Sequence, residues 1–187
     1  MTRVVEVTPE RFAGWLERFA ANNREPEPAQ RISSREDFPH DPLAVLLIRR
    51  GGYAVGLAHG PAFADSKVGR RHVQSRTAAG GWSQQRFARR RGNQADELVR
   101  AVAEHAARVL ARHTDPRGLV VGGDRTLVGE VLEDSRLRHL LHLPRRELYD
   151  LPDPKRVVLE EALRRGRAVR LTIEDDAPGT VPASPPR

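Results

Sequence analysis

The residues best suited to chemistry gather between positions 75 and 94, in the stretch SRTAAGGWSQQRFARRRGNQ. Gly80 and Gly81 form a flexible pair whose backbone can adopt positive φ and approach another surface closely. Arginine forks bind phosphates, so a cluster of them beside a glycine pair predicts an anionic partner. The candidate binding and catalytic residues around the glycines are Arg76, Trp82, Ser83, Gln84, Gln85, Arg86, Arg89, Arg90 and Arg91.

A long helix is predicted directly after the glycines. The hydroxyl of Ser83 suits an N-cap, because it can accept a hydrogen bond from a free backbone N–H. Apolar residues then recur at helical intervals as far as Leu110, which predicts a helix from Ser83 to about His113. At about 1.5 Å per residue such a helix is roughly 45 Å long. Its apolar stripe lies mostly in the second half, so we expect a glycine loop carried on a basic helical stalk.

The segment GGWSQQRFARRR resembles the loop and following helix in the central domain of eukaryotic and archaeal class-1 peptide release factors. It is more similar still to the release-factor-like peptidyl-tRNA hydrolases of ribosome quality control, in which the glycines are followed by a Ser-Gln pair. The similarity continues through ELVRAVAEHAARVL, GLVVGGD and RRELYDL, and covers roughly Leu43 to Glu174. Trp82 stands where release factors have their catalytic glutamine. By the Ser-Gln pattern the matching amide is Gln84, with Gln85 second.

This resemblance implies a stand-alone, codon-independent enzyme that hydrolyses the ester of peptidyl-tRNA on stalled ribosomes. Gln84 would position a water, since a neutral amide offers both a donor and an acceptor. Gly80 and Gly81 would permit entry into the ribosome, and the arginines would hold RNA phosphates. Trp82 would stack on a base or anchor the loop. The implied partners are the rRNA of the large subunit and peptidyl-tRNA, with no cofactor.

Two alternatives remain at this stage. Some quality-control relatives release the nascent chain by cutting the tRNA near its 3′ end, and the sequence does not separate strand cleavage from ester hydrolysis. The other alternative is a non-catalytic RNA- or ribosome-binding module, for which the glycine-arginine segment is a flexible basic loop.

Composition agrees with a polyanionic partner. The 187 residues carry a formal charge of +7, which favours RNA or DNA. Among the 32 basic residues, Lys67 and Lys155 are the two lysines and the others are arginines. There are no cysteines, which excludes disulfides and thiolate metal sites. No long apolar run indicates a membrane span or signal peptide, so we expect a cytoplasmic protein, as a monomer.

Other candidate motifs are weaker. His139 and His142 have a spacing that can bring two imidazoles to one metal, but nothing beside them completes a zinc site. The turn Gly122-Gly123-Asp124 lacks the pattern of a nucleotide-binding loop, so we interpret it as the capped start of a helix. We therefore expect neither a metal nor a nucleotide.

The predicted fold is α+β, a mixed sheet flanked by helices. Strands are predicted at 3–7, 43–48, 53–57, 62–68, 118–121, 147–151 and 168–173, with a hairpin around Gly69 that pairs 62–68 with 70–75. Besides the long helix, helices are predicted from Pro9, after Asp124 and over 154–165, the last ending at Gly166. Three regions follow: an N-terminal helix and irregular arm (1–42) packed on the main domain, a release-factor-like catalytic domain (43–174) and a disordered tail (175–187).

Overall fold

The computed structural model describes residues 1–24, 30–70 and 84–175, with the backbone alone described for 84–94. The contacts between residues divide the chain into two compact units. Unit 2 comprises residues 40–166, and unit 1 comprises residues 1–39 and 167–187. In the described part of the chain, no helix combines the length and the apolar character that crossing a bilayer requires.

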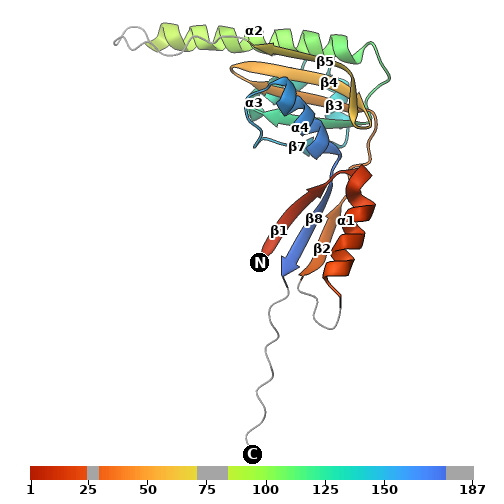
Figure 1. Ribbon diagram of the computed structural model, residues 1–187. Coiled ribbons are helices and arrows are strands. Elements are labelled where there is room, and N and C mark those ends of the chain that lie inside the picture. Colours follow the sequence, from red (N-terminus) through yellow and green to blue (C-terminus); the bar gives the residue numbers. More distant parts are fainter. Residues whose placement is uncertain (25–29, 71–83, 176–187) are drawn as a thin grey trace, which may run out of the picture. The chain divides into compact units, whose positions relative to one another are not determined.

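Unit 2 is built on a five-stranded mixed sheet with the strand order β5-β4-β3-β6-β7, and Figure 1 labels all of these strands except β6. The strands are β3 (Leu43–Arg49), β4 (Gly52–His59), β5 (Ala62–Arg70), β6 (Gly118–Gly123) and β7 (Arg145–Glu147). Neighbours β3, β4 and β5 run antiparallel, whereas β6 runs parallel to both β3 and β7. The predicted α+β class with a mixed sheet is therefore confirmed.

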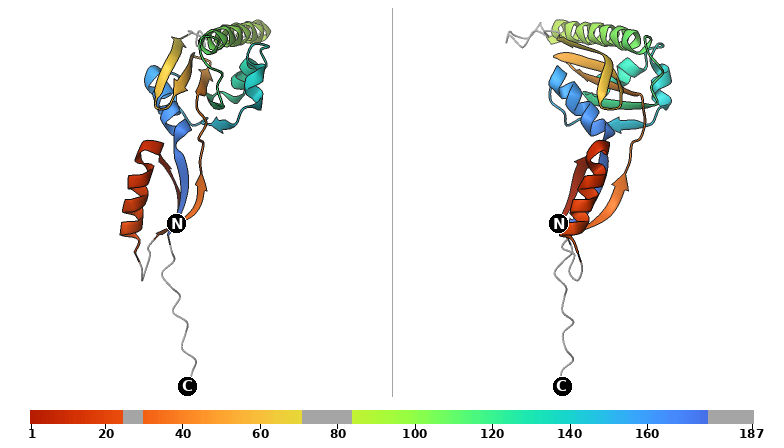
Figure 2. Two further views of the ribbon diagram at one scale, coloured as in Figure 1. Left: turned by 90° about the vertical axis from the view of Figure 1, so that its right-hand side faces the viewer. Right: turned by 45° about the vertical axis from the view of Figure 1, so that its right-hand side comes forward.

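Helices cover both faces of this sheet, as Figures 1 and 2 show. On one face, α2 (Gln84–Leu110), α3 (Arg125–Leu132) and the short 3₁₀ helix η1 (Arg138–His142) share a core with alternate strand residues such as Leu119 and Val121. On the other face, α4 (Arg156–Arg167) packs so closely that a Cβ on Gly166 would lie 2.5 Å from Val120. Because both faces are covered, the side chains of β3 are buried without interruption from Leu43 to Ile48.

The turn from β6 into α3 forms as the sequence predicts. Gly123 has a φ of +101°, and a Cβ there would lie 2.1 Å from the carbonyl oxygen of Ile48, so only glycine fits. The carboxylate of Asp124 then accepts hydrogen bonds from the backbone N–H groups of Thr126 (3.0 Å) and Leu127 (3.2 Å), which makes Asp124 the N-cap of α3.

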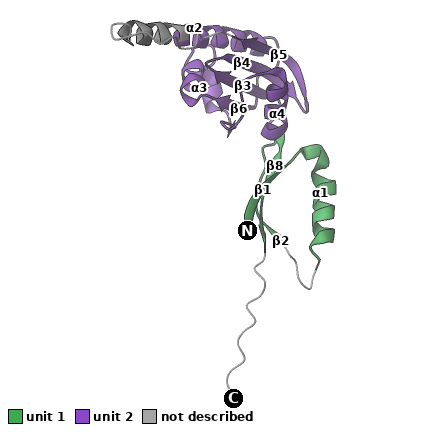
Figure 3. Cartoon of the chain, turned by 60° about the vertical axis from the view of Figure 1, so that its left-hand side comes forward, with its two compact units in different colours: residues 1–39, 167–187 green, residues 40–166 purple. Residues whose placement is uncertain are grey.

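Unit 1 is a three-stranded antiparallel sheet with one helix, coloured green in Figure 3. Its elements are β1 (Thr2–Val7), α1 (Pro9–Asn22), β2 (Gln30–Glu36) and β8 (Val169–Asp175), with β8 between β1 and β2. Phe12 and Trp15 of α1 pack against the small core around Leu171, as their helical spacing predicts. Leu16, the next residue of this helix, is 40% exposed.

Two predictions about local structure in unit 2 are wrong. Gly69 does not turn a hairpin: it lies inside β5, which pairs with β4 as far as Arg70. A glycine is needed there because the ring of Tyr53 lies where a Cβ would be, 2.3 Å away at the nearest atom. Gly166 likewise does not end its helix, which continues to Arg167; it is small because Val120 packs on it.

Other differences lie at element boundaries. The region 22–42, predicted to be irregular, contains β2, whose polar sequence QRISSRE hides its strand character. The strand predicted at 147–151 is β7, at Arg145–Glu147. Thr8 stands at the N-cap of α1 without a side-chain capping hydrogen bond. The units also divide the chain differently from the predicted regions, because β8 pairs with β1 and β2. The predicted tail after Asp175 lies outside the described residues.

Candidate nucleic-acid interface

The glycine loop lies between two elements of unit 2. Strand β5 ends at Arg70 and α2 begins at Gln84, so the loop connects an edge strand to the helix that covers the same sheet. Five of the predicted site residues lie outside the described residues, namely Arg76, Gly80, Gly81, Trp82 and Ser83. The structure therefore describes the two elements from which the loop extends.

The remaining predicted site residues occupy the first turns of α2. Gln84 and Gln85 open the helix, and Arg86, Arg89, Arg90 and Arg91 follow within it. The first backbone N–H groups of a helix have no acceptor within it, and the helix dipole adds partial positive charge at that end. The first turn of α2 contains no acidic residue. The backbone at the amide pair thus favours a negatively charged group.

The second half of α2 fixes the helix to the sheet. Leu98, Val102, Ala103, Ala106 and Val109 are at most 6% exposed and belong to the main core. At about 1.5 Å per residue, Leu98 lies roughly 21 Å along the helix from Gln84. The predicted apolar stripe in this half is confirmed, and it holds the helix that carries the candidate site.

Tyr53 ties the end of β5 to α2. It faces Gly69 across the β4–β5 pair, and its ring stacks on the imidazole of His105 with 5.4 Å between centroids. Burial is the main cause that raises the pKa of the Tyr53 hydroxyl above its usual value. The strand before the glycine loop and the helix after it therefore both contact one buried aromatic side chain. The sequence reasoning missed this pair; an aromatic residue in one strand and a glycine near the end of the next are its only signal.

Comparison with known proteins identifies the family. The family model described as "Actinobacteria/chloroflexi VLRF1 release factor" matches residues 41–172. The chain belongs to this release factor family. The match includes the whole segment from the glycine pair through α2, and extends into β8 of unit 1.

Two longer proteins are also similar to this member of the family. Peptide chain release factor subunit 1 of Thermococcus sibiricus is 26% identical over 104 residues, which are 54% of this chain and 25% of that protein. The crystal structure of the archaeal translation termination factor aRF1 aligns with a TM-score of 0.42 and 18% identity, over 66% of this chain and 34% of that one. The chain thus spans about a quarter of the first relative and about a third of the second.

The weaker motifs of this family member have structural explanations. The carboxylate of Asp124 already occupies the N–H groups at the start of α3, so turn chemistry accounts for Gly122 and Gly123. His139 and His142 lie in η1. Within residues 1–24, 30–70 and 84–175, no group of three or more histidines and acids is arranged to hold a metal ion.

Proposed function

We propose that this protein hydrolyses peptidyl-tRNA on stalled ribosomes and releases the nascent chain without reading a codon, a role in translation termination or ribosome rescue. Membership of a release factor family carries the proposal, because the match contains the glycine and glutamine segment. The polarity of the start of α2 supports it, since the amides stand where backbone N–H groups attract negative charge.

Gln84 acts by orienting one water against the ester carbonyl. The peptidyl ester is already reactive, so placing the water supplies much of the required rate enhancement. A neutral amide both donates and accepts hydrogen bonds and adds no charge to a pocket walled by RNA. Backbone N–H groups near Gly81 and Gln84 stabilise the oxyanion that develops on the carbonyl.

The basic residues hold the enzyme on RNA. Arg86, Arg89, Arg90 and Arg91 bind phosphates of large-subunit rRNA or of the tRNA. Gly80 and Gly81 keep the loop thin enough to enter the ribosome, while Trp82 stacks on a base or anchors the loop. The protein works in the cytoplasm as a monomer and needs no cofactor.

The decisive experiment adds the protein to stalled ribosome–nascent-chain complexes, follows peptide release and sequences the 3′ end of the released tRNA. We expect release with intact CCA ends. The Gln84→Ala variant should bind ribosomes normally and release peptide at least about 100-fold more slowly, the size typical of a lost positioning group.

Other outcomes would contradict parts of this proposal. Loss of the 3′ nucleotides would show that the protein cleaves the tRNA strand and does not hydrolyse the ester. If the wild-type protein bound ribosomes without releasing peptide, it would be a non-catalytic ribosome-binding module. The Gln85→Ala variant is the matched control, and an inactive Gln85→Ala with a normal Gln84→Ala would reassign the essential amide.

A further inference from the structure

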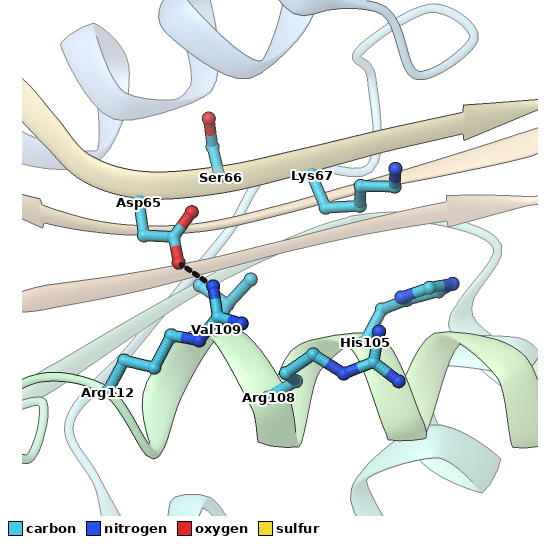
Figure 4. Close-up of a pocket in the computed structure, with 7 residues that line it drawn as sticks. All are labelled: Asp65, Ser66, Lys67, His105, Arg108, Val109 and Arg112. Carbon is cyan, nitrogen blue, oxygen red and sulfur yellow. Dashed lines mark ion pairs between the residues drawn. The ribbon is translucent and has the colours of Figure 1, made fainter.

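A second basic site lies far along α2 from the amide pair. A groove of about 220 Å³ runs between β5 and α2 of unit 2 and is lined by residues of both the strand and the helix (Figure 4). Its lining consists of Asp65, Ser66, Lys67, His105, Arg108, Val109 and Arg112. At about 1.5 Å per residue, Arg108 lies roughly 36 Å along α2 from Gln84. A ligand in this groove would therefore contact the protein far from the amide pair.

Strand and helix periodicity places the charges of this groove in two facing rows. Asp65 and Lys67 are two apart on β5 and so lie on one face of the strand, and Figure 4 shows the Asp65 carboxylate directed toward the helix. The hydroxyl of the intervening Ser66 points away and accepts a hydrogen bond from Arg156 at 2.6 Å. Arg108 and Arg112 are one turn apart on the opposite wall.

The positive charge in the groove is only partly neutralised. Asp65 is the single acid among the lining residues that the structure describes, and it is shared by Arg112 (3.7 Å) and His113 (3.9 Å). Arg108 pairs with Glu104 one turn earlier on α2, with both side chains more than half exposed. Lys67 makes no ion pair to any residue that the structure describes. Exposed pairs contribute at most about 1 kcal/mol each, so a phosphate can take their place.

We propose that this groove binds phosphate groups of an RNA backbone, as a second contact to the RNA on which the proposed function acts. An acidic protein segment is the other polyanion to consider, but interfaces between proteins usually centre on accessible apolar anchors. Val109, the one apolar residue among the described residues of the lining, is 6% exposed and belongs to the core. Polar, strongly positive surfaces are typical of nucleic-acid interfaces. This inference rests on the proposed function for the identity of the RNA.

The test compares two doubly charge-reversed variants in RNA binding. Lys67→Glu/Arg108→Glu changes the groove, and Lys155→Glu/Arg138→Glu makes the same change of charge at exposed positions that do not line it. Binding of a fluorescently labelled RNA hairpin is followed by anisotropy over a range of KCl concentrations. We expect the groove variant to bind at least about 10-fold more weakly, with a salt slope smaller by about two, since each lost phosphate contact removes about one. The control should keep the wild-type slope.

Several results would overturn the inference. Equal losses in both variants would mean that net charge alone is measured, and no loss in the groove variant would mean that RNA does not enter. If a polyglutamate peptide displaced the hairpin from the wild-type protein and failed to bind the groove variant, the partner would be an acidic protein. Circular dichroism checks folding; if the groove variant were misfolded, Lys67→Gln/Arg108→Gln would carry the same test.

Failure of this site is distinguishable from failure of the proposed function. If Gln84→Ala abolished peptide release while the groove variant bound RNA normally, the proposed hydrolase activity would be supported and the groove would not be an RNA site. If the wild-type protein released no peptide while the groove variant lost RNA affinity, the groove would be an RNA site and the proposed hydrolase activity would be wrong. With both correct, the groove variant should raise the KM of release and leave kcat unchanged, because contacts made equally in the ground and transition states affect only KM.

Discussion

Strands β3 and β8 each lie at the centre of a sheet, yet their side chains are buried in different patterns. In unit 2, β3 reads LAVLLIR and buries six consecutive residues. In unit 1, β8 reads VRLTIED, and only its alternate residues Val169, Leu171 and Ile173 are buried. The difference follows from the number of covered faces, since β3 has helices on both and β8 packs on the core beneath α1. Unit 2 therefore has the larger core on which to hold the candidate site.

The largest effect should come from opening that core. Leu47→Ala in β3, where the side chain is 1% exposed, should lower the free energy of unfolding by about 3–5 kcal/mol, because a cavity forms between two closely packed layers. Urea denaturation followed by far-UV circular dichroism measures it. A loss below about 1 kcal/mol would show that the sheet closes around the gap and that the contrast between the units is smaller than described.

The matched substitution in unit 1 should cost less. Leu171→Ala removes a fully buried leucine from a core whose partners Phe12 and Trp15 are only partly buried, so the surroundings can relax into the gap. We expect about 2–3 kcal/mol. The chain has two tryptophans, so a Trp82→Phe background leaves Trp15 as a fluorescent reporter of unit 1. If the loss exceeded that of Leu47→Ala, the ranking of the two cores would be reversed.

Helix capping gives a smaller contrast between the units. Asp124 caps α3 through two hydrogen bonds from backbone N–H groups, whereas Thr8 makes no side-chain cap to α1. Asp124→Ala should therefore cost about 1 kcal/mol of unfolding free energy, and Thr8→Ala less than about 0.5 kcal/mol. Thermal denaturation of both variants measures the difference. Equal losses would mean that Thr8 contributes through something other than its cap position.

The smallest predicted effect is a pH dependence. Hydrogen bonds from Arg136, first from its side chain and then from its backbone N–H, lower the pKa of Asp134 from 3.8 to about 2. Because the pKa is lower in the folded protein, the ionised Asp134 stabilises the fold fully at pH values above its unfolded-state pKa near 3.8. This stabilisation is lost as the pH falls toward 2. Asp134→Asn should flatten the stability profile between these two pH values and nowhere else. Urea denaturation at several acidic pH values tests this, with Glu133→Gln as the neighbouring control.

Much of this fold was predictable from the sequence, for reasons that specific residues show. The continuous apolar run at β3 matches its continuous burial, and the alternating sequence of β8 matches its alternating burial. Asp124 follows two glycines, a pattern that predicts a turn into a capped helix. The polar strand β2 was missed because its pairing to β8 is set by a neighbour more than 130 residues away. Gly69 was misread because its reason for being small, the Tyr53 ring, lies on another strand.

The two candidate binding sites also differ in whether the sequence could predict them. The glycine pair, the amides and the arginines are contiguous in sequence, so their grouping and family resemblance were visible without a structure. The groove was not visible, because Lys67 and Arg108 are 41 positions apart in the numbering and meet only when α2 folds back over β5. Residues that act together through tertiary contact leave no local pattern.

Because β5 lies at the edge of its sheet, the charge of Lys67 also affects the solubility of the protein. An edge strand offers unpaired backbone groups to other molecules, and charged side chains along it discourage edge-to-edge pairing of sheets into aggregates. Asp65, Lys67 and Arg70 all lie on this strand. Replacing Lys67 by an apolar residue would thus create a solubility hazard, so engineered forms of this protein should keep a charge of either sign at that position.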